Sequence, residues 1–68
     1  MTISESVIKL RRSLGLEQQE LAEILGITHT SISNYENGKR HPRIRIVRKM
    51  LELAKKHKIK LTLEDFFD

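Results

Sequence analysis

The feature that most constrains the fold of this sequence is a pair of short apolar patterns that meet at a glycine. The first pattern covers residues 18–25, and the second covers residues 29–37 behind Thr28, a residue type that favours the N-cap of a helix. Gly26 lies between them and suits the left-handed conformation in which many helices end. The apolar and small residues of the two patterns are Leu21, Ala22, Ile24, Leu25, Ile27, Ile32 and Tyr35. Ala22 would let two helices cross closely, so we predict a helix-turn-helix corner, although any small helical bundle can contain one.

Apolar stripes at helical spacing continue on both sides of this corner. The N-terminal stripe predicts a helix over residues 5–14 that begins after Ser4. After a polar loop at residues 39–42, a fourth helix is predicted by the stripe Ile44, Val47, Met50, Leu51 and Ala54. Thr62 can cap a short last helix over residues 63–67. With 68 residues and no cysteine, we expect one all-α domain, residues 1–68, with an aliphatic core.

The charge of the chain is unevenly distributed. Thirteen lysines and arginines against nine acidic residues give a net charge of +4, and residues 39–60 hold most of the basic ones. A basic block of this kind suits either a solvated face or contact with a polyanion. Because the block begins directly after the second helix of the corner, contact is favoured there. We predict phosphate binding by Lys39, Arg40 and Arg43, which lie in and beside the adjoining loop.

The outward face of the second helix of the corner is polar but carries no long charged side chain. At about 100° per residue, one arc of this helix contains His29, Thr30, Ser33, Asn34 and Asn37. A merely solvated face would more often carry Lys and Glu. Amide, hydroxyl and imidazole groups suit hydrogen bonds to base edges, so this pattern favours a surface that reads DNA sequence.

These residues are part of a longer pattern that spans nearly the whole chain. The pattern consists of Leu10-Arg11, Gly15-Leu16, Gln18, Glu20-Leu21-Ala22, Leu25-Gly26-Ile27, Ile32-Ser33, Tyr35-Glu36-Asn37-Gly38 and Pro42. In it the sequence resembles the phage repressor and Cro family of helix-turn-helix domains, also called the Xre family. The resemblance implies a compact five-helix bundle of the lambda-repressor type, with the helix at about residues 29–37 in the major groove of double-stranded DNA.

The resemblance also implies roles for individual residues. Phosphate-binding positions correspond to Gln18 and Asn37, and a structural ion pair corresponds to Arg11 and Glu36. The base-facing positions correspond to His29, Thr30, Ser33 and Asn34. Glu17 departs from the family pattern, which has threonine or serine at the start of this helix. A carboxylate there would repel a phosphate near Gln18, which weakens that assignment.

The C-terminal region carries more apolar side chains than one core contact requires. Ile46 and Leu53 widen the stripe of the fourth helix, and Phe66 and Phe67 are adjacent in sequence, so both cannot easily point inward. An apolar patch would then remain exposed on a monomer. We therefore predict a homodimer whose interface contains Ile46, Leu53, Phe66 and Phe67.

The expected function is transcriptional regulation in the cytoplasm, on the nucleoid, through a pseudo-palindromic operator, with repression as its outcome. The short tail after the fourth helix favours a Cro-like protein, a restriction-modification controller, or an antitoxin that neutralises a toxin protein and represses its own operon. No small-molecule ligand, cofactor or membrane association is expected, because the chain has no phosphate loop, signal peptide or long apolar segment. The spacing of the three histidines matches no metal site, and no nucleophile accompanies Glu20 and Glu23, so an enzyme is disfavoured.

Overall fold

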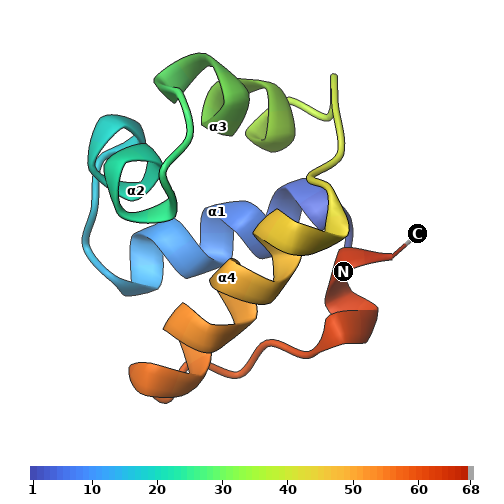
Figure 1. Ribbon diagram of the computed structural model, residues 1–68. Helices are drawn as coiled ribbons and strands as arrows, with labels where there is room; N and C mark the ends of the chain where they lie inside the picture. The colour runs from blue at the N-terminus through green and yellow to red at the C-terminus, as the bar shows by residue number, and fades with distance from the viewer. Residues whose placement is uncertain (68) are drawn as a thin grey trace.

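The computed structural model describes residues 1–67, which form four α-helices and one 3-10 turn. The helices are α1 (Ile3–Ser13), α2 (Gln18–Leu25), α3 (His29–Glu36) and α4 (Ile44–Lys56), and the turn is η1 (Leu63–Phe66). Helix α3 packs on both α1 and α2, whereas η1 packs on α1 and α4 (Figure 1). The result is an all-α domain. Helices α2 and α3 pack together at one end, and the C-terminal turn η1 lies against α1 and α4.

The predicted fifth helix is a single 3-10 turn. Its start is closed by the Asp65 carboxylate, which accepts a hydrogen bond from the backbone N–H of Thr62 at 2.9 Å. The chain leaves the turn at Phe67 with extended backbone angles. Phe66 inserts into the core while Phe67 is 59% exposed. The turn therefore contains four residues, and Phe67 follows it as the C-cap.

The first helix begins two residues earlier than the sequence predicted, and Ser4 is not its cap. Thr2 caps α1, because its side-chain oxygen accepts from the backbone N–H of Glu5 at 3.1 Å. The Glu5 carboxylate in turn accepts from the backbone N–H of Thr2 at 2.8 Å, which completes a capping box. These hydrogen bonds, the one from the Thr2 backbone foremost, lower the pKa of Glu5.

The core is aliphatic, with Tyr35 and Phe66 as its aromatic members. Its residues are Ile3, Val7, Leu10, Leu21, Ala22, Leu25, Ile32, Tyr35, Ile46, Val47, Met50, Ala54 and Phe66. Ile46 is 5% exposed and Phe66 is 3% exposed, so neither contributes to the exposed apolar patch from which the dimer interface was predicted. Helix α4 contacts α2 as well as η1. It therefore buries a wider arc than a helix with one neighbour.

Candidate nucleic-acid interface

Helix α3 is fixed to the domain by one face and leaves the other open. Its inward residues Ile32 and Tyr35 are buried, and α3 packs on α1 and α2. The Thr28 hydroxyl accepts from the backbone N–H of Ser31 at 3.1 Å, so the N-cap predicted from the sequence is present. Gly26 ends α2 at φ 72°, in the left-handed region that glycine adopts without strain. These local features set α3 against α2 at a tight corner.

The outward face of α3 holds the polar residues predicted to read DNA. His29, Thr30 and Asn37 are exposed, whereas Ser33 and Asn34 are half-buried. The amide of Asn37 donates to the hydroxyl of Ser33 at 3.4 Å. No described residue hydrogen-bonds the side chain of Asn34 or Thr30 in residues 1–67, so these groups remain open to a ligand.

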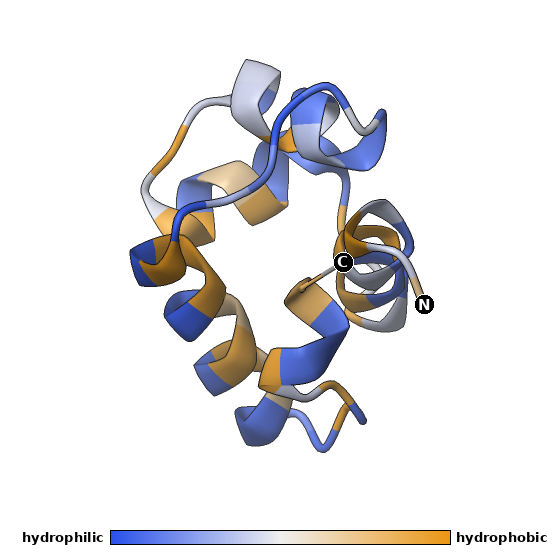
Figure 2. Cartoon of the chain, turned by 90° about the vertical axis from the view of Figure 1, so that its right-hand side faces the viewer, coloured by the Kyte–Doolittle hydropathy of each residue, from blue (hydrophilic) through white to orange (hydrophobic). Residues whose placement is uncertain are grey.

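The loop after α3 folds back on the helix that precedes it. The backbone carbonyl of Asn34 accepts from the N–H of Lys39 at 2.9 Å and from the N–H of Arg40 at 3.3 Å. These bonds hold two exposed cations beside the end of α3, and Arg43 is exposed as the N-cap of α4. Figure 2 shows the segment between α3 and α4 in hydrophilic colours along its length. The structure thus brings Lys39, Arg40 and Arg43 to one flank of the polar face.

Four polar side chains from three helices form a chain of hydrogen bonds that ends on this face at His29. Arg11 of α1 contacts Glu36 of α3 through Nε at 2.6 Å and through Nη2 at 3.1 Å. The amide nitrogen of Gln18, at the start of α2, donates to the same carboxylate at 3.0 Å. The amide oxygen of Gln18 lies 2.9 Å from Nε2 of His29. Sequence reasoning placed Arg11 with Glu36 but gave no signal for the contacts of Gln18.

The Arg11–Glu36 pair is largely removed from solvent. The side chains are 18% and 6% exposed, respectively. The hydrogen bond with Glu36 raises the pKa of Arg11. Arg11 also donates to the backbone carbonyl of Leu16 at 3.1 Å. The pair therefore ties α1 to the end of α3 and to the loop before α2.

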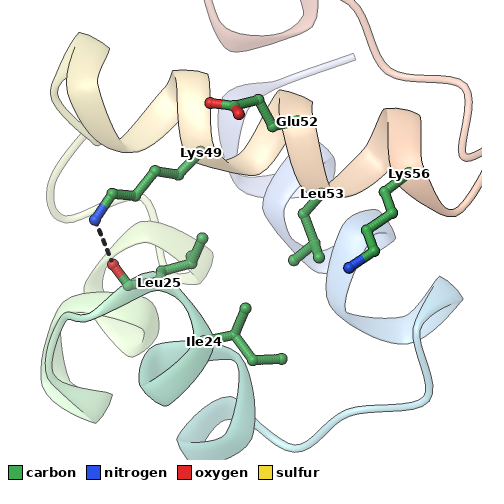
Figure 3. A pocket seen from close by; sticks show the side chains of 6 residues that line it. All are labelled: Ile24, Leu25, Lys49, Glu52, Leu53 and Lys56. Carbon is green, nitrogen blue, oxygen red and sulfur yellow. Dashed lines mark hydrogen bonds between the residues drawn. The ribbon is translucent and has the colours of Figure 1, made fainter.

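The residues predicted to form a dimer interface lie in different environments. Leu53 is half-buried and Phe67 is exposed, while Ile46 and Phe66 belong to the core. Leu53 lines a hollow between α2 and α4, where Lys49 donates to the backbone carbonyl of Leu25 at 3.2 Å (Figure 3). Ile24 of α2 lines the same hollow and is 55% exposed. The apolar pattern of α2 did not indicate that this side chain would be exposed.

Within residues 1–67 no three His, Cys, Asp or Glu side chains are grouped so that they could hold a metal ion. None of the helices described is long and apolar enough to cross a membrane.

A polar helix set on a second helix by a glycine turn, with cations at its flank, defines a DNA-binding helix-turn-helix domain. Residues 7–61 match the helix-turn-helix family HTH_3, and the protein belongs to this family of non-enzymatic DNA-binding domains.

Over 51 residues the chain is 33% identical to Repressor protein C of Escherichia phage P2, a match covering 75% of this chain and 52% of that protein. The chain spans about half the length of this relative. No solved structure matches the chain significantly. The family predicted from the sequence is confirmed.

Proposed function

We propose that this protein is a sequence-specific transcriptional repressor that binds a pseudo-palindromic operator as a homodimer, with α3 in the major groove. The observation that carries the proposal is the uncharged polar face of α3 next to the exposed cations Lys39, Arg40 and Arg43. Base contacts specify a sequence and phosphate contacts position the protein on it. The similarity to a phage repressor supports repression as the outcome.

In this proposal the residues divide into two groups by their chemistry. His29, Thr30, Ser33 and Asn34 read base edges from the face of α3. Gln18, Asn37, Lys39, Arg40 and Arg43 bind phosphate around that face. Gln18 keeps one amide hydrogen for a phosphate, because an amide nitrogen carries two and Glu36 accepts one. Selection of bound sequences from random duplex DNA tests the proposal, and enrichment of a two-fold symmetric motif is the expected result.

Replacing Asn34 should separate reading of sequence from general affinity. The amide of Asn34 presents an acceptor and donors that match N7 and N6 of adenine, and loss of such a bidentate contact costs about 1 to 3 kcal/mol. We expect Asn34→Ala to relax one position of each half-site and to leave binding to random duplex DNA unchanged. Competition between operator variants, followed by fluorescence anisotropy, measures this difference.

Arg40→Ala is the matched variant for this experiment and should show the opposite pattern. Loss of a phosphate contact weakens binding to all sequences alike. If Asn34→Ala weakened binding to every sequence equally, α3 would not be the reading element, and the roles given to His29, Thr30 and Ser33 would fail with it.

Dimerisation is proposed to use the C-terminal region. Phe67 is exposed and Leu63 is 45% exposed, and a shallow apolar hollow nearby is lined by Leu51, Ile59 and Leu61. Exposed apolar groups gathered in this way are typical of contact surfaces. A two-fold partner there would set the half-sites about one DNA turn apart. Leu53 lines the other hollow, between α2 and α4, so it would join this interface only if the contact extended across α4.

Phe67→Ser should weaken dimerisation measured by sedimentation equilibrium over a range of protein concentrations. Burial of a phenylalanine contributes about 1.5 to 3 kcal/mol, so the dissociation constant should rise about tenfold or more. Ile44→Ser is the control for loss of an exposed apolar side chain, because Ile44 is 47% exposed and does not line the hollow of Leu51, Ile59 and Leu61. A wild-type chain that stays monomeric both alone and on DNA would refute the dimer.

A further inference from the structure

The side-chain amide of Gln18 lies between a carboxylate and an imidazole, and this position determines how the amide is oriented. Its nitrogen is 3.0 Å from Oε1 of Glu36, and its oxygen is 2.9 Å from Nε2 of His29. A carboxylate only accepts hydrogen bonds. The reverse orientation would place the amide oxygen against the carboxylate oxygen, with no hydrogen between them.

Arg11 holds the Glu36 carboxylate in place, so Glu36 cannot turn away to accommodate the reverse orientation of the Gln18 amide. Its guanidinium binds both carboxylate oxygens, at 2.6 Å and 3.1 Å, and the Glu36 side chain is 6% exposed. A bidentate, charge-assisted pair of this kind fixes the position of the carboxylate. The amide oxygen of Gln18 must therefore face His29 as a hydrogen-bond acceptor.

We infer that Gln18 fixes the tautomer of His29 and so limits this position to bases that present an amino group. Because the amide oxygen accepts, Nε2 of His29 must carry the hydrogen, and Nδ1 of the neutral ring keeps its lone pair. Within residues 1–67 no side chain or backbone group hydrogen-bonds Nδ1. Gln18 is thus a positioning residue that acts through His29. This step rests on the proposed function, in which His29 faces the bases.

The chemistry of the base edges then determines what His29 can read. In the major groove, adenine N6 and cytosine N4 are donors, whereas guanine N7 and O6 and thymine O4 are acceptors. A lone pair on Nδ1 accepts from adenine or cytosine and is repelled by guanine. His29 lies at the start of α3 and ends the hydrogen-bond chain that begins at Arg11. Through His29, this chain therefore determines which base the protein accepts.

Nitrogen-15 NMR of His29 in the free protein tests the tautomer directly, at about pH 8.5, where an ordinary imidazole is neutral. We expect the nitrogen-15 shifts of wild-type His29 to show a protonated Nε2 and an unprotonated Nδ1. In Gln18→Met the minor tautomer should become about fivefold more abundant, the ratio that one hydrogen bond of average net strength maintains. Gln19→Met is the control, because Gln19 is exposed on the same helix and its spectrum should match wild type. Equal tautomer populations in wild type and Gln18→Met, or a major Nδ1–H form in wild type, would overturn the inference.

Selection from random duplex DNA tests the consequence for recognition. Every base pair offers one amino group in the major groove, on adenine or on cytosine, so analogue duplexes are needed to identify the contacted group. At the position whose preference disappears in His29→Ala, replacing adenine by purine, or cytosine by an analogue without N4, should weaken binding by wild type and affect Gln18→Met less. Replacing the purine of that pair by its 7-deaza analogue, which removes the N7 acceptor, should leave wild-type binding unchanged. Loss of wild-type affinity with the 7-deaza analogue but not on removal of the amino group, or no position that depends on His29, would overturn the inference while DNA reading by the other residues stands. Failure of wild type to enrich any sequence would instead refute the proposed function, and the NMR result would still report the tautomer.

Discussion

Raising the salt concentration from about 50 to about 200 mM should weaken DNA binding by this protein about a thousandfold. Lys39, Arg40 and Arg43 are exposed on one flank of α3, and a dimer would bring two such sets to the duplex. Each neutralised phosphate contributes about −0.9 to the slope of log affinity against log salt, so the dimer should show a slope of about −4 to −8. Titrations of labelled duplex DNA at several salt concentrations measure the slope, and a monomer would give about half of it.

Variants that remove one charge show where the slope originates. Arg40→Gln should lower the slope by about one for each protomer. Lys58→Gln removes the same charge just beyond α4, whose C-terminal end lies away from α3 (Figure 1), and should leave the slope nearly unchanged. Binding that hardly changes with salt, or equal effects of the two variants, would rule out the proposed phosphate contacts.

The corner formed by α2 and α3 could be predicted closely because its signals are local. Thr28 as N-cap and Gly26 in a left-handed conformation fix the ends of the two helices through backbone chemistry that each residue carries itself. The predicted ranges, 18–25 and 29–37, differ from the observed helices by one residue, Asn37, which is the C-cap of α3. The polar face of α3 followed from the same helical period.

Features that depend on distant segments could not be read from the sequence. Ser6 is fully buried because its hydroxyl donates to the carbonyl of Asp65 at 2.7 Å, across most of the chain. Ile46 is buried in a core to which residues of α1, α2, α3 and η1 also contribute. The contacts of Gln18 join residues that meet only once three helices have packed. Helical periodicity within one segment contains no information about such neighbours.

Replacing Arg11 with alanine should be the most destabilising single change among the polar residues of this protein. It would leave the Glu36 carboxylate, which is 6% exposed, with the amide of Gln18 as its remaining donor. An uncompensated buried charge of this kind costs about 3 to 5 kcal/mol in free energy of unfolding. Thermal and urea denaturation followed by circular dichroism measure the loss. Arg12→Ala is the matched control, because Arg12 is exposed and its replacement should change stability by less than about 0.5 kcal/mol.

Glu36→Ala should cost less than Arg11→Ala, although both variants break the same pair. Arg11 is 18% exposed and keeps its bond to the carbonyl of Leu16, so its charge stays partly hydrated after Glu36 is removed. We expect the free energy of unfolding to fall by about 2 kcal/mol, a value within the range for hydrogen bonds to charged groups. The double variant should lose less than the sum of the two single losses, because the second replacement removes a charge that the first left unpaired. If the Arg11→Ala and Glu36→Ala proteins melted like wild type, the pair would be a surface contact without structural weight, and the fixed orientation of Gln18 would lose its basis.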